Sequence, residues 1–98
     1  MTKSILTAAA VNIFEDLGFP HQEAEHLIIR ADLVLQIRRY IQAQQWTTEQ
    51  ASIRCNTSID RIEALLQGKI GEFTIEQLIT LLSRVGMKVR LEVMAEAA

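Results

Sequence analysis

The stretch "TTEQASIRCNTSIDRIEALLQGK", residues 47–69, carries the clearest structural signals in the chain. Thr47 is followed three residues later by Gln50, which is the spacing of a capping box at the start of a helix. Asn56 follows the first short helical pattern, and asparagine is the non-glycine residue best suited to a positive φ. These residues predict a short helix that begins after Thr47 and ends in a tight turn at Asn56.

A second helix is predicted directly after this turn. Thr57 or Ser58 can cap it, and Asp60 then lies in its first turn, where a negative charge suits the helix dipole. Gly68 ends the helix as a left-handed glycine cap would. The two helices and their turn predict a helix-turn-helix over residues 47–67.

The inward positions of these helices, and of the helix that follows them, are apolar. Thr74 with Gln77 forms a second capping box, and Gly86 ends this last helix. Ala51 is small, as two short helices that cross steeply at close approach require. The residues that we expect to face inward are Trp46, Ala51, Cys55, Ile62, Leu65, Phe73, Ile75, Leu78, Leu81 and Leu82.

A longer helical pattern precedes the capping box. Apolar residues recur at steps of three and four from residue 22 to about residue 44, which is typical of an amphipathic helix. They are Ala24, Leu27, Ile28, Ala31, Leu35 and Ile41. Gly18 and Pro20 interrupt the chain before this helix. We therefore expect a helical domain over residues 22–86, preceded by an N-terminal arm over residues 1–21, with or without a short helix.

The C-terminal segment "MKVRLEVM", residues 87–94, changes to the alternating period of a β-strand. A lone strand would leave its backbone groups unpaired. We therefore expect it to pair with the same strand of a second chain, antiparallel about a two-fold axis. The interface residues would be Val89, Arg90, Leu91 and Val93, and residues 95–98 would form a tail. A rival arrangement pairs this strand with part of the N-terminal arm.

The charge of the chain is unevenly distributed. The net charge is −2, but residues 34–71 form the only third in which basic residues outnumber acidic ones. Because neutralised phosphates supply much of the affinity of proteins for nucleic acid, this third is where DNA would bind.

The composition argues against several other classes of protein. We find no nucleophile–base arrangement and no phosphate-binding glycine loop, so we expect no enzymatic activity and no cofactor. His21 and His26 do not make a metal site. Cys55 is the only cysteine, so no internal disulfide can form and a reducing compartment fits. Without a long apolar run or a signal peptide, we expect a cytoplasmic protein with no membrane partner.

Residues 47–68 resemble the XRE/Cro-type helix-turn-helix family, and the resemblance continues through "GEFTIEQLITLLSRVG". It covers roughly Leu33 to Gly86. The C-terminal strand and the opening "NIFEDLGF" are similar to one branch, the short HigA-like antitoxins that pair with RelE-like toxins. The resemblance implies a mostly α fold, a lambda-repressor-like bundle of about five helices whose C-terminal strand pairs across a dimer.

The resemblance also implies residues that contact DNA. Thr47 and Thr48 stand where relatives brace against the DNA backbone, and Lys69 stands where relatives hold a phosphate. Ile59, Asp60 and Ala64 occupy positions that read bases. Ile59 can touch a thymine methyl group and Asp60 can accept from a cytosine amine. Ser58 and Arg61 are further candidate contacts.

Two functions follow from these expectations. The first is a dimeric DNA-binding regulator, an antitoxin-like autorepressor of a palindromic operator. The alternative is a protein-binding module that neutralises a RelE-like toxin and reads DNA weakly or without specificity. The acidic residues Glu15, Asp16, Glu23 and Glu25 would suit a basic toxin.

Overall fold

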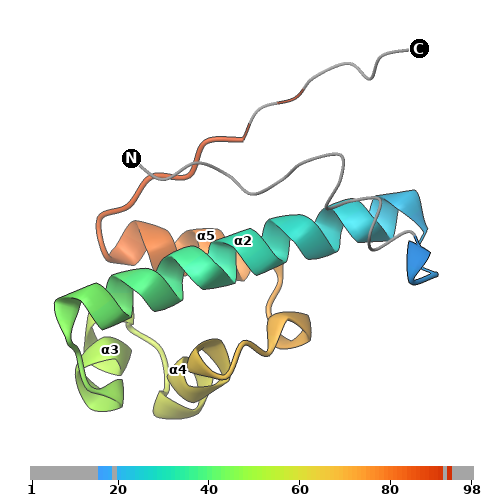
Figure 1. The fold of residues 1–98 in the computed structure, drawn as a ribbon. Coiled ribbons are helices and arrows are strands. Elements are labelled where there is room, and N and C mark those ends of the chain that lie inside the picture. Colours follow the sequence, from blue (N-terminus) through green and yellow to red (C-terminus); the bar gives the residue numbers. More distant parts are fainter. Residues whose placement is uncertain (1–15, 19, 92, 94–98) are drawn as a thin grey trace.

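The computed structural model describes residues 16–18, 20–91 and 93 of the 98-residue chain. These residues form a helical bundle with four α-helices and one 3₁₀ turn, and no strand is found among them. The elements are α2 (His21–Gln44), α3 (Thr48–Cys55), α4 (Ile59–Leu66), η1 (Ile70–Glu72) and α5 (Ile75–Arg84). Figure 1 shows α2 running across the molecule, with α5 along one side of it and α3 and α4 on the other.

Helix α2 has 24 residues and is therefore about 36 Å long. It is the long helix expected from the sequence, but the buried positions differ from the expected ones. Ala24, Ile28 and Ile41 are buried, whereas Leu27, Ala31 and Leu35 are only half-buried. The core positions of the C-terminal half are Leu33, Val34, Ile37 and Ile41. Helix α2 contacts α5, α4 and η1, so its buried face is wider than a single helical stripe.

The predicted start signals of α3 and α4 are confirmed. The Thr47 amide donates to Gln50 Oε1 at 2.9 Å, and the Gln50 amide donates to Thr47 Oγ1 at 3.1 Å. Of the two candidate caps for α4, Ser58 is the one used, because its Oγ accepts from the Arg61 amide at 3.2 Å. Each contact satisfies an amide that the first turn of a helix otherwise leaves unpaired.

The turns and helix ends also follow the sequence. Asn56 has a φ of 52°, and the Thr57 amide donates to the Ser52 carbonyl at 2.9 Å. Gly68 and Gly86 have φ values of 74° and 87°. After Gly68, the Lys69 amide donates to the Ala64 carbonyl at 3.0 Å, which is the long bond of a Schellman cap. The 3₁₀ turn η1 was not expected from the sequence.

The core lies where α2, α3, α4 and α5 meet, and it contains most of the residues predicted to face inward. The buried cluster consists of Leu33, Val34, Ile37, Ile41, Ala51, Cys55, Ile62, Ala64, Leu65, Phe73, Leu78, Leu81 and Leu82. Trp46 and Ile75 pack against this cluster but remain half-buried. The short helices α3 and α4 therefore pack against α2 and α5 through one shared core.

The C-terminal segment is not a strand among the residues described, 87–91 and 93. Met87 and Val89 pack against the core, while Leu91 is 55% and Val93 96% exposed. The apolar residues of the alternating pattern thus continue beyond the edge of the bundle. A strand needs a partner edge, and the described part of this single chain offers none. The expected N-terminal arm lies largely outside the described residues.

Candidate nucleic-acid interface

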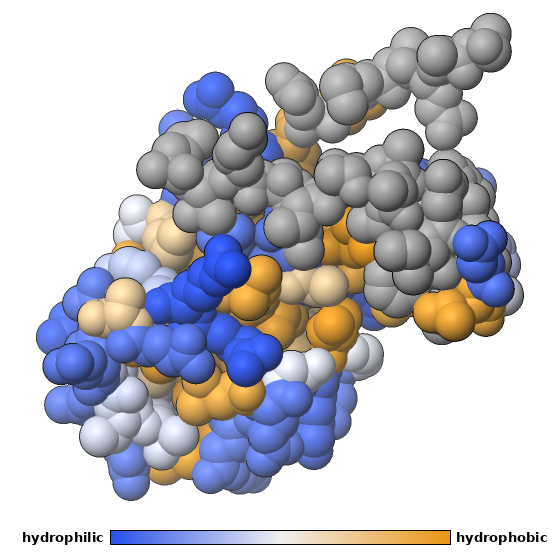
Figure 2. All heavy atoms as spheres, in the orientation of Figure 1, coloured by the Kyte–Doolittle hydropathy of each residue, from blue (hydrophilic) through white to orange (hydrophobic). Residues whose placement is uncertain are grey.

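The unit formed by α3, the Asn56 turn and α4 has a buried inner side and a polar outer surface. On its inner side, Ala51 and Cys55 are 0% and 1% exposed, and the small Ala51 lets the short helices pack closely. Figure 2 shows mostly hydrophilic residues over the part of the molecule where α3 and α4 lie in Figure 1, with apolar residues visible mainly between the elements. The outer surface of this unit is therefore the face available to a polar partner.

Arg84, in the last turn of α5, clamps the turn between the two helices. Its Nη1 donates to the Cys55 carbonyl at 3.1 Å and to the Asn56 carbonyl at 3.0 Å. These carbonyls lie at the C-terminal end of α3, which carries the negative end of the helix dipole. Bonds from a charged donor are stronger than those between neutral groups. Arg84 therefore fixes the turn relative to α5.

We expect Arg84→Ala to lower the free energy of unfolding by about 1.5–3 kcal/mol, because it removes a charged donor from two carbonyls. Urea denaturation followed by circular dichroism measures the loss. Arg39→Ala, at an exposed position of α2, removes the same charge and is expected to change stability by less than about 0.5 kcal/mol. Equal losses in the two variants would mean that the clamp contributes nothing.

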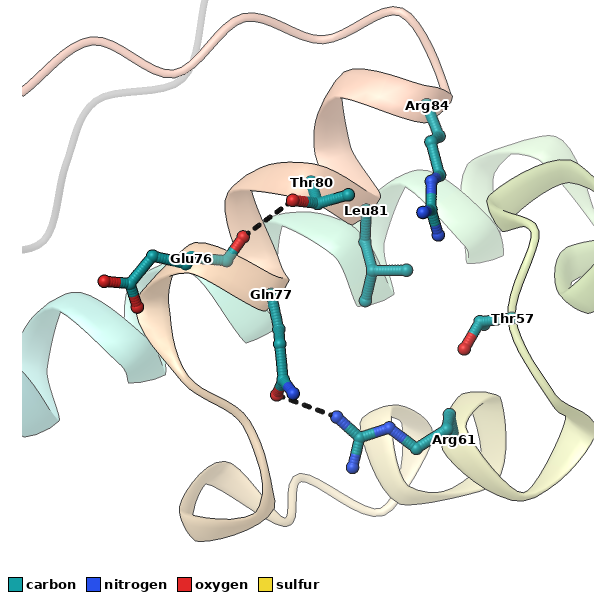
Figure 3. Close-up of a pocket in the computed structure, with 7 residues that line it drawn as sticks. All are labelled: Thr57, Arg61, Glu76, Gln77, Thr80, Leu81 and Arg84. Atoms are coloured by element: carbon teal, nitrogen blue, oxygen red, sulfur yellow. Dashed lines mark hydrogen bonds between the residues drawn. The ribbon is translucent and has the colours of Figure 1, made fainter.

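Arg61 connects α4 to η1 and to the first turn of α5. Its Nη1 donates to the Glu72 carbonyl at 2.9 Å. Its Nη2 donates to Gln77 Oε1 at 3.0 Å, as Figure 3 shows. The guanidinium also lies 4.0 Å from the centre of the Phe73 ring, a cation–π contact. The expected DNA contact therefore belongs to a side chain that points toward α5 and is already bonded there.

The exposed face of α4 carries only part of the expected set of residues. Ile59 is 41% exposed, and Asp60, Glu63 and Gln67 are exposed as well. Ala64, expected at a base-reading position, is only 6% exposed. It belongs to the core cluster, so a base cannot reach it. The resemblance that implied a base-reading role for Ala64 did not allow for the contact that buries this face of α4.

The hydroxyl groups at the two helix starts are exposed and hydrogen-bonded. Thr47 and Ser58 accept from backbone amides as caps, and Thr48 Oγ1 donates to Glu49 Oε1 at 3.3 Å. A capping hydroxyl retains its own hydrogen as a donor. Thr47 and Ser58 can therefore still donate to a phosphate.

Lys69 lies beyond the glycine cap of α4, at an exposed position. Its Nζ is 3.9 Å from Glu72 Oε2, and both side chains are about half exposed. A surface ion pair of this kind is worth little. Lys69 can therefore leave Glu72 for a phosphate at small cost.

The corner between α2 and α3 is built from aromatic contacts that the sequence did not reveal. The rings of Tyr40 and Trp46 meet edge to face at 5.6 Å, and the Arg54 guanidinium lies 5.7 Å from the Trp46 ring. Trp46, expected to face the core, packs against it while half-buried and also covers this corner. These contacts depend on the angle between two helices, which no local pattern encodes.

A shallow depression of about 290 Å³ lies between α4 and α5, lined by Thr57, Arg61, Glu76, Gln77, Thr80, Leu81 and Arg84 (Figure 3). Its two guanidinium groups are engaged by the bonds described above. Nearby, burial raises the pKa of the Cys55 thiol, and the charge of Arg84 lowers it in part. Because burial dominates, the thiol stays protonated at neutral pH and is a poor nucleophile.

Comparison with known proteins agrees with this geometry. Residues 13–94 match a family described as a helix-turn-helix domain. The chain belongs to this helix-turn-helix family. No curated protein and no solved structure matches it. Family membership, together with the capped helix pair, indicates a DNA-binding regulator.

Two further properties bear on the class of this helix-turn-helix protein. The residues described contain no group of three or more histidine, cysteine, aspartate or glutamate side chains that could hold a metal ion. Within the same residues, no helix has both the length and the apolar character needed to span a bilayer.

Proposed function

We propose that this helix-turn-helix protein is a dimeric transcriptional regulator that binds a palindromic operator, as an autorepressor of the antitoxin type. The observation that carries the proposal is the capped α3–turn–α4 unit, which presents Ile59, Asp60 and Glu63 outward on a helix braced by Arg61. In helix-turn-helix proteins the second helix of such a unit lies in the major groove.

Dimerisation is part of the proposed mechanism. Two recognition helices about 34 Å apart can occupy successive turns of the major groove, whereas one small domain binds weakly. The C-terminal segment supports a strand-paired dimer, because Leu91 and Val93 are exposed apolar residues in an alternating pattern. Val89 and Arg90 complete the proposed interface.

Phosphate contacts would come from the edges of the interface. Thr47 and Thr48 lie at the start of α3 and Lys69 follows the end of α4, all near the helix pair. Each neutralised phosphate adds about −0.9 to the slope of log affinity against log salt. Because Arg61 is engaged within the fold, we expect a shallower slope than the basic middle third of the chain suggests.

The direct test is an electrophoretic mobility shift at low salt with the dimer and the palindrome upstream of its own gene. We expect a discrete complex that weakens as salt rises, and no discrete complex with a scrambled duplex of equal composition. Failure to bind the palindrome better than the scrambled duplex would reject the regulator.

One observation favours a second candidate, the neutralisation of a basic RelE-like toxin. The outward face of α4 is acidic, and Glu23 is exposed at the start of α2, so the surface is complementary to a basic protein. Co-expression with a small basic protein encoded next to the gene tests this candidate. A stable complex without operator binding would favour it, and the two functions can coexist in one antitoxin.

A further inference from the structure

The exposed face of α4 contains hydrogen-bond acceptors and an apolar group but no cation. Asp60 and Glu63 are three residues apart and therefore share one face of the helix. Ile59 precedes them at the helix start, and Gln67 follows at the C-cap. The one arginine of α4, Arg61, is bonded to Glu72 and Gln77. The face is thus more acidic than the sequence of α4 suggests.

This composition restricts the bases that α4 can read. An ionised carboxylate only accepts hydrogen bonds. In the major groove the donors are the N4 amine of cytosine and the N6 amine of adenine, whereas guanine presents only the acceptors N7 and O6. Asp60 and Glu63 therefore attract amine-bearing edges and repel guanine edges.

Ile59 adds an apolar requirement next to the carboxylates. It cannot hydrogen-bond a base, but its exposed methyl groups can pack on the C5-methyl group of thymine. The N-terminal residues of a recognition helix are those that reach base edges. Ile59 and Asp60 occupy that end of α4.

We propose that α4 selects half-sites that place exocyclic amines opposite Asp60 and Glu63 and a thymine methyl group opposite Ile59, and that it rejects guanine at the edges it faces. This inference rests on the proposed function and defines its operator. The same carboxylates repel phosphates and so weaken non-specific binding. They thereby increase the ratio of the affinity for the preferred sequence to the affinity for other sequences.

The first experiment selects binding sites from a randomised duplex with the full-length protein. We expect cytosine or adenine on the contacted strand, with an adjacent thymine. Replacing that thymine by uracil removes one methyl group and is expected to weaken binding about fourfold. Replacing guanines on the same strand by 7-deazaguanine is expected to leave affinity unchanged. Selection of guanine there, or indifference to uracil, would overturn the inference while leaving DNA binding intact.

The second experiment changes the face itself. Asp60→Asn is expected to shift the preferred base from cytosine toward adenine by about tenfold, because asparagine pairs with adenine N6 and N7. It should also raise affinity for scrambled DNA. Glu63→Gln should raise non-specific affinity in the same way. The matched control is Glu23→Gln, an equal charge change at an exposed position in the first turn of α2, at the far end of that helix from α3 (Figure 1).

The outcomes separate the inference from the function beneath it. Operator binding with an unchanged base preference in Asp60→Asn rejects the role of the α4 face alone. Absence of any sequence-specific binding by the wild-type protein rejects the proposed function, and the inference with it. Loss of a complex with a basic protein in Asp60→Asn, without a change at the operator, would assign this face to a protein partner instead.

Discussion

Replacing Phe73 with alanine is expected to lower the free energy of unfolding by about 3–5 kcal/mol. Phe73 is 1% exposed and is among the largest fully buried side chains of the described residues. The loss combines the removal of buried apolar surface with the cavity that remains. Since a small domain has a stability of about 5–15 kcal/mol, this one change removes a large share of it. Urea unfolding measured by circular dichroism gives the value.

The effect is expected to be large also because Phe73 supports Arg61. Its ring lies 4.0 Å from the guanidinium, which in turn bonds to Glu72 and Gln77. Phe73→Leu keeps most of the volume and loses the aromatic face, so it should cost clearly less than Phe73→Ala. A loss near 1 kcal/mol for Phe73→Ala would show that neighbouring side chains fill the cavity and that the ring contributes little to stability.

A double-mutant cycle of Phe73→Leu with Arg61→Met measures the coupling between the two side chains. We expect an interaction energy of about 0.5–2 kcal/mol. If the losses of unfolding free energy in the two single variants simply add up in the double variant, the ring and the guanidinium do not stabilise each other.

Local signals made the helix-turn-helix predictable. The capping boxes at Thr47 and Thr74, the left-handed Asn56 and the caps at Gly68 and Gly86 all form as expected. Each joins groups only a few residues apart, so the sequence contains both partners within one window. Such signals fix where a helix begins and ends but not which way it turns its side chains.

The orientation of arginines could not be predicted in the same way. Arg61 bonds to residues 11 and 16 positions away, and Arg84 bonds to carbonyls 28 and 29 positions away. The local periodicity of the sequence predicts neither set of hydrogen bonds. The expected base-reading role of Ala64 is wrong for a related reason. Its burial depends on how closely α4 approaches the rest of the bundle.

The basic surplus of residues 34–71 is therefore larger than the positive charge on the surface that would face DNA. Arg61 is half-buried and bonded to Glu72 and Gln77, whereas Arg54 is exposed with its guanidinium over the Trp46 ring. The Arg38 side chain lies close to Gly68, where an added Cβ would meet its Nη1 at 3.5 Å. Charge counted along a sequence measures phosphate affinity only when the side chains reach solvent. An acidic reading face with few outward cations favours binding that depends on base edges and dimer geometry.

Leu91→Asp is expected to abolish the dimer and to reduce operator affinity by about a thousandfold, because a single domain would retain only the weaker contacts of one half-site. In the proposed antiparallel pair, the two-fold axis would bring two copies of this segment together, and burying two aspartates without partners is unfavourable. Leu91 is a better test than Val89, because it is 55% exposed whereas Val89 packs against the core. Light scattering after gel filtration gives the mass, and a mobility shift gives the affinity.

Lys88→Asp provides the matched control, since it adds an acid at an exposed position that is not among the proposed interface residues. It should remain dimeric and lose affinity only modestly, through weaker attraction to phosphates. If Leu91→Asp stays dimeric, strand pairing between copies is wrong, and pairing of this segment with the N-terminal arm becomes the better account. If instead it becomes monomeric but keeps its operator affinity, the dimer exists and the palindromic mechanism fails. The two measurements therefore test the assembly and its use in DNA binding separately.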